Sequence, residues 1–176
     1  MKIAWLLPLG AAAAPLAHVA YAAQYITIEQ AQHAAFPEAT EFTATALGPD
    51  ALASVAAGQG WSPRAWRARA ADRALGWLFV DQVIGKSELI TYAVAIDERG
   101  AVTSIEILDY RESHGGEIRL AGWRKQFVGK TGADPVELNK DIRNISGATL
   151  SCRHVTEGVQ RLLRLYKAAL QAQDRT

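Results

Sequence analysis

The sequence contains very little cysteine: Cys152 is the single example among 176 residues. One cysteine cannot form an intramolecular disulfide. It also excludes haem attachment through Cys-x-x-Cys-His and a cysteine-ligated iron–sulfur cluster. A redox thiol would need a resolving partner, so we interpret Cys152 as a small buried residue near the start of a helix.

An excess of either charge is also lacking. The chain has 19 Lys and Arg against 18 Asp and Glu, without a basic stripe or a block of like charges. The composition therefore gives no indication of nucleic acid or of an anionic membrane surface as a partner. No Gly-x-Gly-x-x-Gly follows a predicted strand, so a nicotinamide site is not indicated. His33 has no partner at metal-binding spacing, and we predict no metal site.

Residues 1–22 have the pattern of a secretory signal peptide. Lys2 is a short basic start, an apolar and alanine-rich run follows, and Ala20-Tyr21-Ala22 is a small-x-small cleavage site. We therefore expect a periplasmic protein whose single domain spans residues 23–176. An uncleaved anchor is the alternative. After residue 22, no stretch is long enough to cross a bilayer.

The remaining pattern predicts an α+β fold in which an antiparallel sheet packs against helices. Apolar or alternating runs predict strands at residues 42–47, 77–84, 88–96 and 102–108. Helices are predicted at residues 27–36, 50–57, 117–127 and 151–171. Since short turns join the successive strands, the sheet should be antiparallel. In the last strand, Thr103, Ile105 and Ile107 are expected on one side.

The last predicted helix has a single apolar face and should cover one face of the sheet. Its apolar positions are Val155, Val159, Leu162, Leu163, Tyr166 and Leu170. Before it, residues 130–140 are polar, contain Gly132 and Pro135, and are predicted to form a surface loop.

The stretch Asp141-Ile142-Arg143-Asn144-Ile145-Ser146-Gly147-Ala148-Thr149 delivers a hydroxyl to the start of this helix. Ser146, Gly147 and Ala148 leave little side-chain bulk, and Gly147 allows a positive φ and a close approach by another group. The first turn of a helix offers unpaired N–H groups and a partial positive charge, which favour a bound anion. The alternative explanation for Ser146 to Thr149 is an ordinary helix N-cap.

The 141–149 stretch resembles the flavinylation motif of the FMN-binding domain family. That family includes the FMN-carrying subunits of the sodium-pumping NADH:quinone reductase and of the Rnf complexes, and similar domains occur in regulators of nitrous oxide respiration. The likeness extends upstream to residues 110–117 and 123–129, and it covers roughly residues 85–170. The larger complexes usually have Glu-Thr-Pro-Gly where this chain has Glu112-Ser113-His114-Gly115.

The resemblance implies that Thr149 carries FMN through a phosphoester, formed by a dedicated FMN transferase that uses FAD and magnesium. It also implies that Ser146, Gly147, Ala148 and Asp141 belong to the attachment segment. It assigns Glu112, Ser113, His114 and Gly115 to the surroundings of the flavin. Asp141 has two interpretations, recognition by the transferase or capping of its own loop. Trp123 and Phe127 flank the isoalloxazine ring or simply form core.

The function implied is that of an exported electron carrier, which passes electrons between membrane or periplasmic redox proteins and is not an enzyme with its own substrate. It can be associated with the membrane through such a partner. One alternative is an FMN-dependent reductase of a small molecule, with Glu112 or His114 as the proton donor. Another is a non-redox module, such as a flavin-binding sensor or an assembly subunit.

Overall fold

The computed structural model describes residues 23–55 and 60–171, and the predicted signal peptide lies outside these residues. A six-stranded sheet in the order β1-β6-β5-β4-β3-β2 forms its centre, and every pair of neighbouring strands is antiparallel. The strands are β1 (Ala23–Gln24), β2 (Glu41–Thr45), β3 (Arg64–Ala70), β4 (Arg73–Ile84), β5 (Leu89–Asp97) and β6 (Val102–Tyr110). This confirms the α+β class and the single domain.

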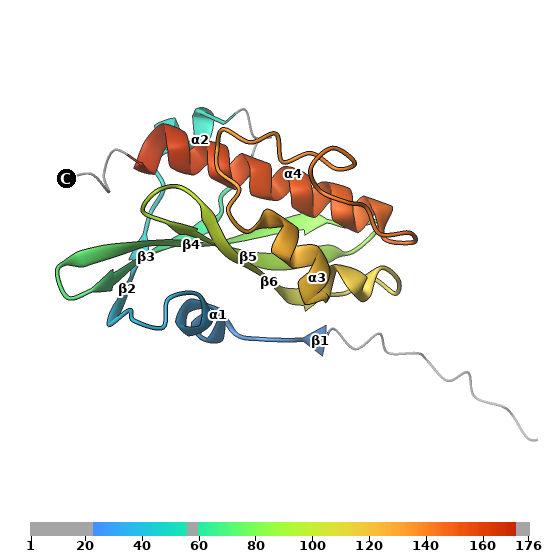
Figure 1. Cartoon of the computed structure of the whole chain (residues 1–176), viewed down its shortest axis with the longest axis horizontal. Coiled ribbons are helices and arrows are strands. Elements are labelled where there is room, and N and C mark those ends of the chain that lie inside the picture. Colours follow the sequence, from blue (N-terminus) through green and yellow to red (C-terminus); the bar gives the residue numbers. More distant parts are fainter. Residues whose placement is uncertain (1–22, 56–59, 172–176) are drawn as a thin grey trace, which may run out of the picture.

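Helices lie on both faces of the sheet (Figure 1). They are α1 (Ile28–Ala35), α2 (Pro49–Ala53), η1 (Gly116–Arg119), α3 (Ala121–Arg124), η2 (Lys125–Phe127), α4 (Thr149–Leu165) and the π-helical turn η3 (Tyr166–Leu170). α4 covers one face and α1 covers the other. α1 begins with a capping box, in which the Thr27 hydroxyl accepts from Gln30 N and the Gln30 side chain accepts from Thr27 N.

The larger core lies between the sheet and α4. Strand β5 contributes Ile90, Tyr92, Val94 and Ile96 to it, all on one face as the alternation predicts. The predicted apolar face of the last helix is buried against these side chains along its whole length. A smaller cluster that includes Ala31, Phe36, Leu78 and Leu108 fills the space under α1.

Strand β6 departs from the expected alternation. Its pairing with β5 shifts between Thr91 and Tyr92 and again between Ala95 and Ile96, so one extra β6 residue is inserted at each place. As a result Val102 faces the α4 core together with Ile105, and Thr103 is exposed. The expectation that Thr103 shares the side of Ile105 and Ile107 is therefore wrong.

Three element boundaries also differ from the prediction. The single helix expected at 117–127 is divided into η1, α3 and η2. The last helix begins at Thr149 instead of near Ser151, which makes Thr149 a helical residue. Strand β4 begins at Arg73, earlier than the apolar run alone indicates. Within the described residues, no helix has both the length and the apolar character needed to span a membrane.

Candidate functional site

Thr149 is the first residue of α4, and its side chain is exposed. The N-cap is Ala148, and no side chain caps this end of the helix. The ordinary N-cap explanation for Ser146 and Thr149 is therefore not what the structure shows. The Thr149 hydroxyl instead accepts a hydrogen bond from Asn144 Nδ2 at 3.0 Å. The first backbone N–H groups of α4 have no partner within the helix and face the same region.

The turn before Thr149 leaves open space beside the hydroxyl. Gly147 has φ +84°, and a Cβ built on it would meet no atom within 4 Å. Ser146 is exposed as well, whereas Ala148 is buried. Gly147 therefore serves the backbone conformation of the turn, and a large group bonded to Thr149 would meet no side chain at this position.

Loop 111–115 packs against the start of α4 through Gly115. Gly115 has φ +83°, and a Cβ there would lie 2.8 Å from the Tyr110 hydroxyl and 3.1 Å from Ala148 Cα. The Tyr110 hydroxyl donates to the His114 carbonyl oxygen at 2.5 Å and lies 3.1 Å from Ser151 Oγ. Burial raises the pKa of Tyr110, against a smaller lowering by its bond to Ser151, so the hydroxyl keeps its proton.

Glu112 points toward the turn between β4 and β5. Its carboxylate accepts from Ser87 N at 2.6 Å and from Glu88 N at 2.9 Å. Partial burial tends to raise the pKa of Glu112. The backbone N–H groups of Glu88, Ser87 and Lys86 together outweigh that effect, so the pKa lies below its ordinary value. Glu112 thus ties two loops together as an ionised acceptor.

These segments form a pocket of about 620 Å³, which we call the Thr149 pocket. It is lined by residues 86–88, 111–114 and 147–151. The structure therefore brings Glu112, Ser113 and His114 together with Gly147, Ala148 and Thr149, as the prediction requires. Ser113 Oγ lies 3.0 Å from Nδ1 of the exposed His114. The pocket also contains Lys86 and Arg111, two cations that the sequence analysis did not single out.

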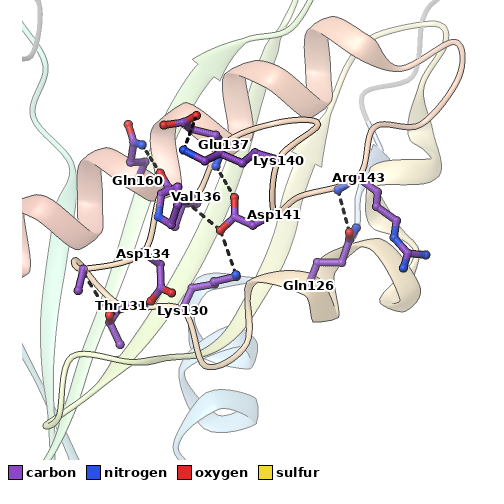
Figure 2. Close-up of polar contacts among 12 residues, drawn as sticks. Gln126, Lys130, Thr131, Asp134, Val136, Glu137, Lys140, Asp141, Arg143 and Gln160 are labelled. Carbon is purple, nitrogen blue, oxygen red and sulfur yellow. Dashed lines mark hydrogen bonds and ion pairs between the residues drawn. The ribbon is translucent and has the colours of Figure 1, made fainter.

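Asp141 lies elsewhere and organises its own loop (Figure 2). Its carboxylate accepts from Glu137 N at 2.7 Å and Val136 N at 3.2 Å, and it pairs with Lys130 Nζ at 2.9 Å. Partial burial tends to raise the pKa of Asp141, but the Glu137 N–H, the Lys130 ammonium and the Val136 N–H lower it overall. Of its two predicted roles, loop capping is the one visible in these contacts.

Trp123 and Phe127 belong to the core. Phe127 is completely buried, and Trp123 is 5% exposed and packs edge-on against it. Trp123 Nε1 donates to the Arg143 carbonyl oxygen at 2.8 Å. Trp123 does line a second pocket, of about 840 Å³, together with Asp141 and Asn144. Cys152 is fully buried, and burial raises the pKa of its thiol, as its interpretation as a small core residue expects.

The site thus combines an exposed hydroxyl, free N–H groups at a helix start and a neighbouring pocket that holds two cations. Residues 85–164 match the model of the FMN-binding domain family. The match lies within the span expected from the 141–149 motif, and it supports a flavin-binding protein with FMN as its ligand. No curated protein matches the chain. The likeness to the sodium-pump and Rnf subunits stays a prediction.

The residues present fit FMN. The N–H groups at the start of α4 favour a phosphate there. Lys86 and Arg111 line the same pocket, together with the carboxylates of Glu88 and Glu112, and Arg111 also pairs with Asp109 at 2.8 Å. Around the candidate site, the sequence did not indicate the supporting contacts of Tyr110, Ser151 and His154. His154 Nδ1 lies 2.5 Å from the Ile84 carbonyl oxygen and 3.0 Å from that of Gly85. These partners are distant in sequence, so no local spacing signals them.

Proposed function

We propose that this protein is an extracytoplasmic electron carrier whose FMN is attached through a phosphoester to Thr149 Oγ. The observation that carries the proposal is the exposed Thr149 hydroxyl at the first position of α4, bordered by open space and by the Thr149 pocket. Export to the periplasm rests on the sequence pattern of residues 1–22. A separate FMN transferase that uses FAD is its partner in maturation, since the Thr149 hydroxyl is bonded to the amide of Asn144, which is not a base.

When bound, FMN supplies one- and two-electron chemistry, and the protein supplies attachment and surroundings. The N–H groups at the start of α4 would hold the phosphate, and Lys86 and Arg111 line the same pocket. Ser113 and His114, which line the pocket, would contact the ring. Glu112 keeps loop 111–115 joined to residues 87 and 88. Gly115 and Tyr110 fix the same loop to α4. The open pocket leaves the ring accessible to a membrane or periplasmic redox protein.

A small-molecule reductase is the second candidate because the exposed His114 lines the pocket. Glu112 does not suit the role of proton donor, since its low pKa keeps it ionised and its carboxylate is engaged by backbone N–H groups. Stopped-flow reoxidation of the reduced flavoprotein separates the two functions. A carrier reacts fast with redox proteins and slowly with small acceptors, and His114→Ala should leave the first rate nearly unchanged.

The attachment is tested by coexpression with an active transferase, followed by intact mass measurement under denaturing conditions. The wild type should gain the mass of one FMN less one water. Thr149→Ala should gain nothing, because it lacks the only side-chain oxygen at this position, and Thr149→Ser should retain part of the modification. The matched control is Thr43→Ala, which removes an exposed threonine on β2 and should be fully modified.

Two results would contradict the proposal. One is an adduct of the same mass on Thr149→Ala, and the other is an unmodified wild type in the presence of a transferase that modifies a known substrate. Either would favour non-covalent FMN at the same helix start.

A further inference from the structure

The side chain in contact with the Thr149 hydroxyl is Asn144, a residue to which the motif alone assigns no role. Its Nδ2 donates to Thr149 Oγ1 at 3.0 Å, while its Oδ1 is buried and has no hydrogen-bond partner among the described residues. A buried amide oxygen without a partner has lost its hydration without a replacement bond, which destabilises the folded state. The amide thus makes a single hydrogen bond, and that bond goes to the hydroxyl that we propose as the attachment point.

The backbone that presents Asn144 is fixed on its N-terminal side. Arg143 N donates to Gln126 Oε1 at 2.8 Å, and the Arg143 carbonyl oxygen accepts from Trp123 Nε1 at 2.8 Å. Figure 2 shows Gln126 reaching up to the Arg143 backbone while the Arg143 side chain points away. Ile142 is almost completely buried. Two side chains of the α3–η2 segment therefore hold the peptide that precedes Asn144.

The other side of Asn144 is a closed turn. Ala148 N donates to the Ile145 carbonyl oxygen at 3.0 Å, and Cys152 N donates to the Ala148 carbonyl oxygen at 2.8 Å as α4 begins. Donor and acceptor thus sit on separately anchored backbone, five residues apart. A hydrogen bond between groups held in this way restricts the Thr149 side chain to one rotamer at little further cost in entropy.

We propose that Asn144 is the positioning residue for phosphoester formation at Thr149, an inference that rests on the proposed attachment. In that reaction Thr149 Oγ bonds to the FMN-side phosphorus of FAD. The pyrophosphate bond to the AMP half breaks, AMP leaves, and the hydroxyl proton goes to a base of the transferase. The Asn144 N–H occupies one lone pair of Oγ, directs the other outward, and afterwards donates to the ester oxygen.

The experiment uses the flavin-free protein, purified from a host without the transferase, together with purified transferase, FAD and magnesium. The initial rate of adduct formation is followed by intact mass over a range of protein concentrations. Asn144→Ala should lower kcat roughly ten- to hundredfold, because a misplaced nucleophile reacts slowly. KM should stay within about twofold, because one side-chain amide contributes little to the affinity of the transferase for this protein. Lys140→Ala, an exposed change nearby, is the control and should match the wild type in both.

Asn144→Asp keeps the shape of the side chain and its acceptors but removes the N–H donor. It should lose at least as much kcat as Asn144→Ala, since a carboxylate beside Oγ also repels the incoming phosphate. Because Asp is close in volume to Asn, this variant tests the positioning role of Asn144 even if the alanine variant folds poorly. Thermal unfolding measures whether each variant is folded.

The outcomes separate the inference from the proposed function. A modified wild type with unchanged kcat in both Asn144 variants would overturn the role of Asn144 alone. A raised KM at unchanged kcat would also overturn it, because Asn144 would then serve recognition by the transferase. Full activity of Asn144→Asp would overturn it as well. A wild type that is never modified would instead remove the attachment itself, and this inference with it.

Discussion

Helix α4 contacts two polar clusters that differ in the burial and pairing of their central oxygen atoms. Near its middle, Asp81 is 5% exposed and accepts from Trp61 Nε1 at 3.0 Å, from the Tyr92 hydroxyl at 2.7 Å and from Arg161 at 3.4 Å. At its start, the hydroxyl of Thr149 is exposed and the amide of Asn144 is half used. We call these the Asp81 cluster and the Thr149 cluster.

The difference indicates which cluster supports the fold and which supports binding. Both oxygens of Asp81 accept from donors of the chain itself, so its charge is already compensated within the fold. The helix even makes room for this pairing, since a Cβ at Gly158 would lie 2.0 Å from the Tyr92 hydroxyl. In the Thr149 cluster, by contrast, the Thr149 hydroxyl is exposed and Asn144 Oδ1 has no partner among the described residues.

Breaking the Asp81 cluster should produce the largest loss of stability. Asp81→Ala leaves the Tyr92 hydroxyl, the Trp61 N–H and the Arg161 guanidinium without their shared acceptor. The free energy of unfolding should fall by about 3–5 kcal/mol, the usual cost of removing one partner of a buried pair. Urea denaturation measures it. The protein that remains folded should still be modified at Thr149.

The control for this change is Glu157→Ala, an exposed substitution on the same helix that should alter stability by less than about 0.5 kcal/mol. A loss below about 1 kcal/mol for Asp81→Ala, or loss of flavin attachment in its folded fraction, would contradict the division into a stabilising and a binding cluster.

A smaller effect is expected where loop 111–115 meets the Thr149 cluster. Gly115→Ala adds a Cβ 2.8 Å from the Tyr110 hydroxyl and 3.1 Å from the backbone of Ala148, in a residue with φ +83°. Gly129→Ala is the matched comparison, since Gly129 has the same φ and no atom within 4 Å of its Cβ position. Both changes incur the strain of a left-handed residue, about 1–2 kcal/mol.

Gly115→Ala should cost about 1–3 kcal/mol more than Gly129→Ala, because it also overpacks the contact with Ala148. It should in addition slow flavin attachment, whereas Gly129→Ala should not. Denaturant unfolding and the mass assay measure the two effects. Equal stability losses for the pair would mean that the contact between Gly115 and α4 is loose.

Local signals in the sequence predicted much of this fold. The helix start at Thr27, the alternation in β5 and the apolar face of α4 each lie within one segment, and each is confirmed. Strand β3 is different, because its Arg and Ala residues have low strand propensity and its place depends on pairing with β4. The bulges in β6 likewise exist only relative to β5, so alternation alone misplaced Thr103.

The residues of the candidate site also divide into those that a local motif locates and those that only folding brings together. Thr149 and its small-residue turn are contiguous, and the motif located them. Tyr110 and Ser151 are 41 residues apart, and Glu112 meets Ser87 across 25 residues, so only the folded chain brings them together. Asn144 lies within the motif, but its importance comes from the direction of its amide and from an unpaired oxygen, which no sequence pattern reveals.

The smallest effect concerns Glu112, the one carboxylate that joins loop 111–115 to residues 87 and 88. Its pKa is below the ordinary value of 4.5 in the folded protein, so its ionisation stabilises the fold above that pH. The contribution is lost as the pH falls through the lower, folded pKa. Glu112→Gln keeps an acceptor but loses the charge, and at neutral pH it should cost about 1 kcal/mol or less, since the group is partly exposed.

The difference in stability between the wild type and Glu112→Gln isolates this group from other carboxylates such as Asp141, because both proteins contain them. Measured by thermal unfolding, the difference should be constant from pH 7 to about pH 5.5 and should shrink as the pH falls below 4.5. A difference that persists unchanged at pH 3 would show that shape, not charge, makes the contact. A difference that grows at low pH would mean that Glu112 is protonated in the folded state, which would restore it as a proton donor and favour the reductase over the carrier.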